Sequence, residues 1–145
     1  MILELVATFC SALFAGAAIY INLVEHPARL ECGTAAAVQE WRPSYRRATV
    51  MQASLAIVGL LGAVGAWIQG QGTAVLIAGM VLGSVVPFTL LIIFPTNKAL
   101  EDPALDVGSE RAARLLSKWN RLHALRSVAA LIALILFLLN LGARV

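Results

Sequence analysis

The 145-residue sequence has few charged side chains, and one long stretch of it has none. Asp, Glu, Lys and Arg make up 13% of the chain, and no Asp, Glu, Lys, Arg or His lies between Arg47 and Lys98. Soluble domains carry about a quarter of charged residues. This deficit excludes an ordinary water-soluble domain, and the 60% share of hydrophobic residues indicates an integral membrane protein.

Other scarce features exclude further classes. The two cysteines, Cys10 and Cys32, lie inside and beyond the first apolar run, so they are expected at different depths and without a disulfide. Neither has the Cys or His spacing of a zinc site, and there is no P-loop or G-x-G-x-x-G motif. The net charge of +3 comes from basic residues beside apolar runs, so no nucleic-acid partner is expected.

What the chain does contain is four apolar segments, each long enough to cross a bilayer as a helix. They are predicted at about residues 2–24, 48–68, 73–94 and 122–141, within one domain of residues 1–145. The first segment is expected to be a transmembrane helix and not a cleaved signal peptide. An acidic residue, Glu4, precedes its apolar core, and no basic residue does. Pro43 is expected to stop a short helix before the second segment. The fold class is therefore an all-α integral membrane four-helix bundle.

The basic residues predict how these helices are oriented. Ten of the eleven lie in or beside the first and third connections, and only Arg144 is expected at the opposite side. The positive-inside rule makes the basic side cytoplasmic, with both termini outside, in the inner (plasma) membrane. Ser109 is a plausible N-cap for an amphipathic helix that continues into the last segment, which gives that helix a cytoplasmic extension.

Small residues indicate where the helices pack. Gly62, Gly79 and Gly83 lie at helical spacing in the second and third segments, and Ser11, Ala15 and Gly16 in the first, so close approach is predicted there. Pro87 has no N–H for the carbonyl of Gly83, which predicts a kink that opens space beside Thr89.

All four helices carry polar residues at the cytoplasmic level, while the outer half carries almost none. Because polar side chains facing lipid are unfavourable, these residues are expected to turn inward and line a pocket. His26 and His123 are the only histidines, and imidazole is a natural proton carrier near neutral pH. Candidate catalytic residues are His26, His123 and Arg126; candidate substrate-binding residues are Asn22, Gln52, Thr89, Asn97 and Trp119.

Simpler interpretations stand beside this one. Arg29 and other basic residues are expected to mark topology or extend to the interface, and Trp41 and Tyr45 to anchor it. His26 precedes Pro27 and can simply end its helix. No cofactor is expected, and a metal on His26, His123 and Glu25 is an alternative that the residue spacing does not require.

Four sequence blocks together resemble a small four-helix membrane family. They are "VEHPAR" (24–29), "PSYRRATVMQ" (43–52), "VPFTLLIIFPTNKAL" (86–100) and "WNRLHALRS" (119–127). That family is largely of unknown function and includes anthrone oxygenase-like proteins. The resemblance implies that His26, Asn97, Trp119, His123 and Arg126 are the positions of interest, and that some members oxidise an anthrone to an anthraquinone without a classical cofactor.

Two functions remain open from the sequence. In the first, the protein is a cofactor-independent oxygenase or oxidoreductase, or a binding protein, for an apolar aromatic or quinone-like molecule that enters from the bilayer. His26 or His123 would remove a proton, and Arg126, Asn97 or Gln52 would stabilise the enolate oxygen. In the second, it is a non-catalytic helical module that binds lipid, a membrane-protein partner or another copy of itself.

Overall fold

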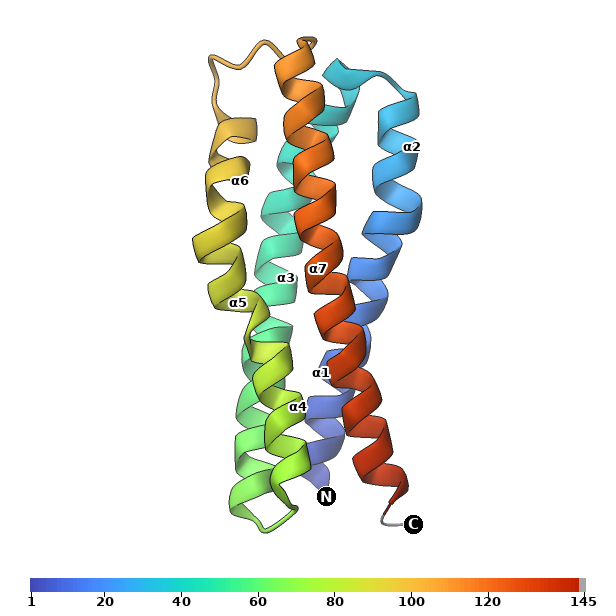
Figure 1. The fold of residues 1–145 in the computed structure, drawn as a ribbon, viewed down its shortest axis with the longest axis vertical. Coiled ribbons are helices and arrows are strands. Elements are labelled where there is room, and N and C mark those ends of the chain that lie inside the picture. The colour runs from blue at the N-terminus through green and yellow to red at the C-terminus, as the bar shows by residue number, and fades with distance from the viewer. Residues whose placement is uncertain (144–145) are drawn as a thin grey trace.

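The computed structural model describes residues 1–143, which form four long helical rods and contain no strand (Figure 1). All four rods are long and apolar enough to cross a membrane, which confirms the predicted fold class. In chain order the elements are α1 (Ile2–Tyr20), η1 (Ile21–Glu25) and α2 (His26–Glu31) in the first rod; α3 (Thr34–Ile68) in the second; α4 (Thr73–Gly83), α5 (Val85–Phe88), η2 (Thr89–Ile93) and α6 (Phe94–Glu101) in the third; and α7 (Glu110–Gly142) in the fourth.

The two ends of the bundle differ in polarity. The α2–α3 and α6–α7 connections lie at one end, and most of the basic residues lie on the helix segments beside them; the N-terminus, the α3–α4 turn and the end of α7 lie at the other end (Figure 1). The end with the α2–α3 and α6–α7 connections is called the polar end below. Arg144, expected at the opposite end, lies outside the described residues. Ser109 caps α7 as predicted, with its Oγ accepting from the N–H of Ala112 at 3.2 Å.

The expectation that Pro43 stops a helix is wrong. It lies inside α3, which runs without interruption through 35 residues. Proline withdraws one backbone hydrogen bond, here to the carbonyl of Gln39, but neighbouring contacts hold the helix on both sides. Trp41 is fully buried, and Arg42 donates from Nε to the carbonyl of Leu100 at 2.9 Å, which ties α3 to the end of α6.

The third rod is interrupted where Pro87 predicts it. α4 ends at Gly83, Ser84 follows, and α5 begins at Val85, so the rod changes direction there (Figure 1). The missing N–H of Pro87 leaves the Gly83 carbonyl without its usual partner. The predicted kink is therefore confirmed.

Two π-helical turns, absent from the sequence prediction, precede prolines at corresponding places in the first and third rods. The N–H of His26 bonds to the carbonyl of Ile21, and that of Phe94 to the carbonyl of Thr89, each five residues back. Pro27 and Pro95 come next in the sequence. The expectation that His26 ends its helix is wrong, because the wider turn lets the helix continue. Such turns often occur at functional sites.

Glycines bring the rods together as predicted, with one exception. A Cβ atom on Gly62 would lie 2.9 Å from the carbonyl oxygen of Leu3, and one on Gly79 would overlap the Cβ of Ala63. Gly83 is similarly close to Leu60. Gly16 is exposed and has no neighbour within 4 Å of such an atom, so it lies outside the packing seam.

Candidate functional site

The rings of both histidines pack against the ring of one tryptophan in the polar half of the bundle. Trp119, on α7, has its ring centroid 5.4 Å from that of His26 and 4.8 Å from that of His123. His26 is 0% and His123 1% exposed. Trp41 from α3 packs edge-on against Trp119 at 5.7 Å. The structure therefore brings together three of the sequence-predicted residues from the first and fourth rods.

A hydrogen-bond network fixes the orientation of His123. The side chain of Asn22 donates from Nδ2 to Oδ1 of Asn120 at 2.7 Å, which leaves its own Oδ1 as an acceptor. That oxygen lies 2.5 Å from Oγ of Ser127 and 3.0 Å from Nδ1 of His123. Nδ1 therefore carries the hydrogen in the neutral ring, and Nε2 carries the lone pair that can accept a proton.

Arg126 lies one turn further along α7 and pairs with the second rod. Its Nη2 donates to Oε1 of Gln52 at 2.8 Å, and its guanidinium carbon lies 5.5 Å from the ring centroid of Phe14. Gln52 is 1% exposed and Arg126 9% exposed. A buried guanidinium with a neutral acceptor keeps its positive charge available to a second group.

Three buried N–H donors belong to residues around one narrow chamber. Among residues 1–143, Nε1 of Trp41, Nε2 of Gln52 and Nε of Arg126 have no hydrogen-bond partner. All three residues line a chamber of about 10 Å³, together with Trp119 and His123. This is room for about one water-sized molecule. Buried donors are nearly always paired, so their residues suit a small hydrogen-bond acceptor here.

His26 completes the buried polar cluster without a polar contact of its own. Neither of its ring nitrogens has a hydrogen-bond partner within the described chain. Glu25, the carboxylate of the alternative metal set, is engaged by Arg29 and accepts from Oγ of Ser44 at 2.7 Å. The described residues contain no group of three or more His, Cys, Asp or Glu that could hold a metal. The absence of a cofactor stays a prediction.

The remaining two candidates lie at the edge of the cluster. Thr89 donates from Oγ1 to the carbonyl of Val85 at 2.6 Å and lines a pocket of about 70 Å³ with Gln52 and Arg126, beside the kink. Asn97 is buried and donates to Oη of Tyr45 at 3.0 Å. It therefore joins the cluster only through another side chain.

Two aromatic residues that the sequence predicts at the membrane interface, Trp41 and Tyr45, belong instead to the site. Trp41 is fully buried rather than exposed at an interface, and Tyr45 stacks on it at 4.8 Å. The signal was present: Trp41, Tyr45, Ala48 and Gln52 follow one another at steps of four, three and four, which places them on one helix face. This helix face was not predicted because a helix break was expected at Pro43. Trp119, a substrate-binding candidate from the sequence, is 4% exposed.

One further expectation about a charged residue is wrong, and one buried carboxylate was not predicted. Arg29 does not extend to the interface: it is buried, pairs with Glu25, and its Nε lies 2.6 Å from Oε2 of Glu40. The opposite half of the bundle is not free of buried polar groups either. Glu4 is fully buried there and accepts from Nδ2 of Asn140, joining the first and last rods. In both cases a partner on a neighbouring turn or rod makes burial favourable.

Fold and site together define a small four-helix protein of the membrane-spanning type, with a buried histidine, tryptophan and arginine cluster in one half. The chain belongs to the anthrone oxygenase family, whose sequence model matches residues 41–136. The match includes Gln52, Trp119, His123 and Arg126 and begins after the first rod.

One curated relative matches nearly the whole chain. The anthrone oxygenase tpcL of Aspergillus fumigatus is 30% identical over an alignment 148 residues long, and the alignment covers 94% of this chain and 91% of the relative. No solved structure matches the chain. The family resemblance seen in the sequence blocks is therefore confirmed.

Proposed function

We propose that this protein catalyses the oxidation of an anthrone-like aromatic ketone by dioxygen, without a cofactor, to give the corresponding quinone. The observation that carries the proposal is the chamber in which His123 meets residues with three unpartnered N–H donors. A base beside a set of hydrogen-bond donors suits a reaction that passes through an enolate. The activity in the name of the tpcL relative is of this kind.

Proton removal comes first. An anthrone has a CH₂ group flanked by two aromatic rings and conjugated with a carbonyl, so its C–H bond is unusually acidic. Nε2 of His123 takes one of these protons, and the C–H electron pair moves onto the carbonyl oxygen. The N–H donors of Gln52, Arg126 and Trp41 then stabilise the enolate oxygen.

Dioxygen completes the reaction. The enolate transfers one electron to O₂, and the resulting radicals combine in a C–O bond, which gives a peroxide at the former CH₂ carbon. Loss of the second C–H proton and cleavage of the O–O bond form the new carbonyl and release hydroxide, which is protonated to water. One CH₂ group and one O₂ thus become one C=O group and one water, and His123 is returned to its neutral form.

Location follows from the same chemistry. An apolar aromatic ketone partitions into a bilayer, and the four rods are long and apolar enough to cross one. We propose a multi-pass protein of the inner (plasma) membrane with its polar end in the cytoplasm and both termini outside. The basic residues on the helix segments at the polar end support this orientation (Figure 1).

The proposal is tested by following oxidation of dithranol, a dihydroxylated anthrone, in air by protein purified into lipid nanodiscs. We expect dithranol to be oxidised faster with wild type than with empty nanodiscs. In His123→Ala the protein-dependent rate should be lower by about a hundredfold or more. Arg121→Ala changes an exposed residue of the same helix and should keep the wild-type rate. A wild-type rate equal to that of empty nanodiscs, or to that of folded His123→Ala, would overturn the proposal and favour the non-catalytic module.

A further inference from the structure

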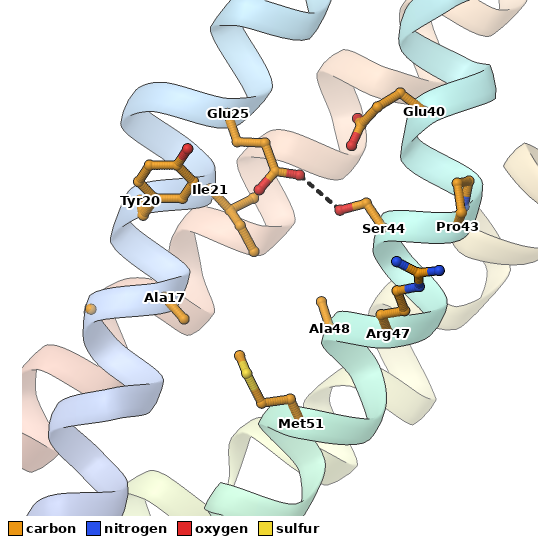
Figure 2. Close-up of a pocket in the computed structure, with 11 residues that line it drawn as sticks. Ala17, Tyr20, Ile21, Glu25, Glu40, Pro43, Ser44, Arg47, Ala48 and Met51 are labelled. Carbon is orange, nitrogen blue, oxygen red and sulfur yellow. Dashed lines mark hydrogen bonds between the residues drawn. The ribbon is translucent and has the colours of Figure 1, made fainter.

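A large groove opens between the first and second rods, beside the candidate site (Figure 2). It has a volume of about 640 Å³ and is bounded by α1 and η1 on one side and α3 on the other. Its wall is apolar away from the polar end, where Ala17 and Met51 lie, and polar toward that end, where Glu25 and Ser44 face each other. The groove is therefore amphipathic along its length.

The groove and the chamber share one wall. Ile21, Ser44 and Ala48 line both of them, so the open groove and the chamber lie on either side of these residues. Ile21 is the first residue of the π-helical turn η1 and is 7% exposed. Ile21 is therefore the large apolar side chain in the wall that the two spaces share.

Size decides where an aromatic substrate is held. The chamber of about 10 Å³ admits a water-sized molecule, and the pocket of about 70 Å³ behind it is also too small for a three-ring compound. The groove falls within the range of about 300–1,000 Å³ that is typical of small-molecule sites. Of these three spaces, the groove is the one that fits the ring system.

We propose that the α1–α3 groove is the binding site for the substrate of the proposed reaction, a flat aromatic ketone with hydroxyl groups. This inference rests on the proposed function. The ring system lies against Ala17 and Met51, and a polar group on an outer ring reaches the carboxylate of Glu25 and the hydroxyl of Ser44. The central ring, with its CH₂ group and carbonyl, passes Ile21 toward the chamber that His123 lines. The substrate enters sideways from the lipid, without crossing the polar end.

The inner pockets continue beyond the chamber and suit the second reactant. The chamber shares Gln52 and Arg126 with the pocket of about 70 Å³, which shares Val85 and Arg126 with a pocket of about 230 Å³ between α5 and α7. This series of pockets on the opposite face is the route that the proposal assigns to dioxygen, which is small and apolar, while the groove is filled.

The test fills the groove with a bulky side chain and measures binding apart from catalysis. Ala17→Trp on α1 and Met51→Trp on α3 both place an indole in the groove. Ala12→Trp and Val50→Trp add the same side chain at exposed positions of these helices that do not line it. Binding of the dihydroxyanthraquinone product of dithranol is measured by equilibrium dialysis of protein-loaded against empty nanodiscs.

We expect both groove variants to weaken binding of the quinone, and to raise KM for dithranol, by about tenfold or more, while both exposed variants behave as wild type. Equal binding by folded groove variants and exposed variants overturns the groove assignment, even when wild type oxidises dithranol. Weakened binding by the groove variants supports the groove even when no protein oxidises dithranol, a result in which the proposed function alone fails.

Discussion

The amide oxygen of Asn22 accepts a hydrogen bond from Nδ1 of His123 at 3.0 Å, so a residue of the first rod decides which nitrogen of a fourth-rod histidine can take a proton. Asn22 is held in turn by Asn120 and Ser127. Its place in the π-helical turn η1 links this irregularity of the backbone to the proposed chemistry.

Replacing Asn22 should therefore impair catalysis more than folding. Asn22→Leu removes the acceptor and frees the imidazole, and we expect the dithranol oxidation rate to fall on the order of a hundredfold. Asn22→Asp keeps an oxygen facing Nδ1 and should retain most of the activity, because Asn120 can turn its amide to donate to it. Both variants are compared by initial rate and by thermal unfolding. A fully active Asn22→Leu protein would contradict the positioning role.

The pair formed by Gln52 and Arg126 predicts a stability effect. Gln52→Leu leaves a buried guanidinium without its acceptor, so the free energy of unfolding should fall by about 1.5–3 kcal/mol. Gln52→Glu can still accept the hydrogen bond from Arg126, so its free energy of unfolding should fall by less. The measurement is unfolding in mixed detergent micelles followed by circular dichroism. The control is Gln39→Leu, an exposed position of the same helix, expected within about 0.5 kcal/mol of wild type.

Close packing between α3 and α4 gives a second stability prediction. Gly79→Leu drives a side chain into Ala63, and we expect unfolding to become easier by about 1–3 kcal/mol. Gly16→Ala meets no neighbour within 4 Å and should leave the unfolding midpoint unchanged or slightly raised. If the two variants were equally stable, the packing seam assigned to these rods would be wrong.

Membrane orientation is open to a chemical test at one cysteine. Cys32 is exposed in the connection at the polar end, and Cys10 is buried in α1. With the polar end in the cytoplasm, a membrane-impermeant maleimide should label Cys32 in inverted vesicles and spare it in right-side-out vesicles. Cys32→Ser provides the unlabelled control. The reverse pattern would show that the positive-inside rule misassigns this protein.

Much of the architecture follows from hydrophobicity alone. Four apolar runs give four rods, and polar residues within such runs must face inward, which is why His26, His123 and Gln52 could be placed in one buried cluster by depth. The kink at Pro87 followed from the chemistry of proline. These predictions rest on strong and local physical constraints.

The features that could not be predicted depend on neighbours distant in sequence. Whether Pro43 breaks a helix depends on the contacts of Trp41 and Arg42 with other rods, and the assumed break hid the inward face of Trp41. Burial of Glu4 depends on Asn140 in the last rod. The π-helical turns η1 and η2 end directly before His26–Pro27 and Phe94–Pro95, and no sequence pattern used above distinguishes such a turn from an ordinary α-helical one.

The most direct test of the account is hydrogen exchange without oxygen, because it isolates proton removal by His123. Dithranol is incubated in deuterated buffer under anaerobic conditions with nanodiscs that contain wild type or His123→Ala, and loss of the CH₂ proton signal is followed by NMR. If His123 is the base, exchange is faster with wild type than with His123→Ala by about a hundredfold or more, after subtraction of the rate with empty nanodiscs. Equal exchange rates for the two folded proteins would contradict it.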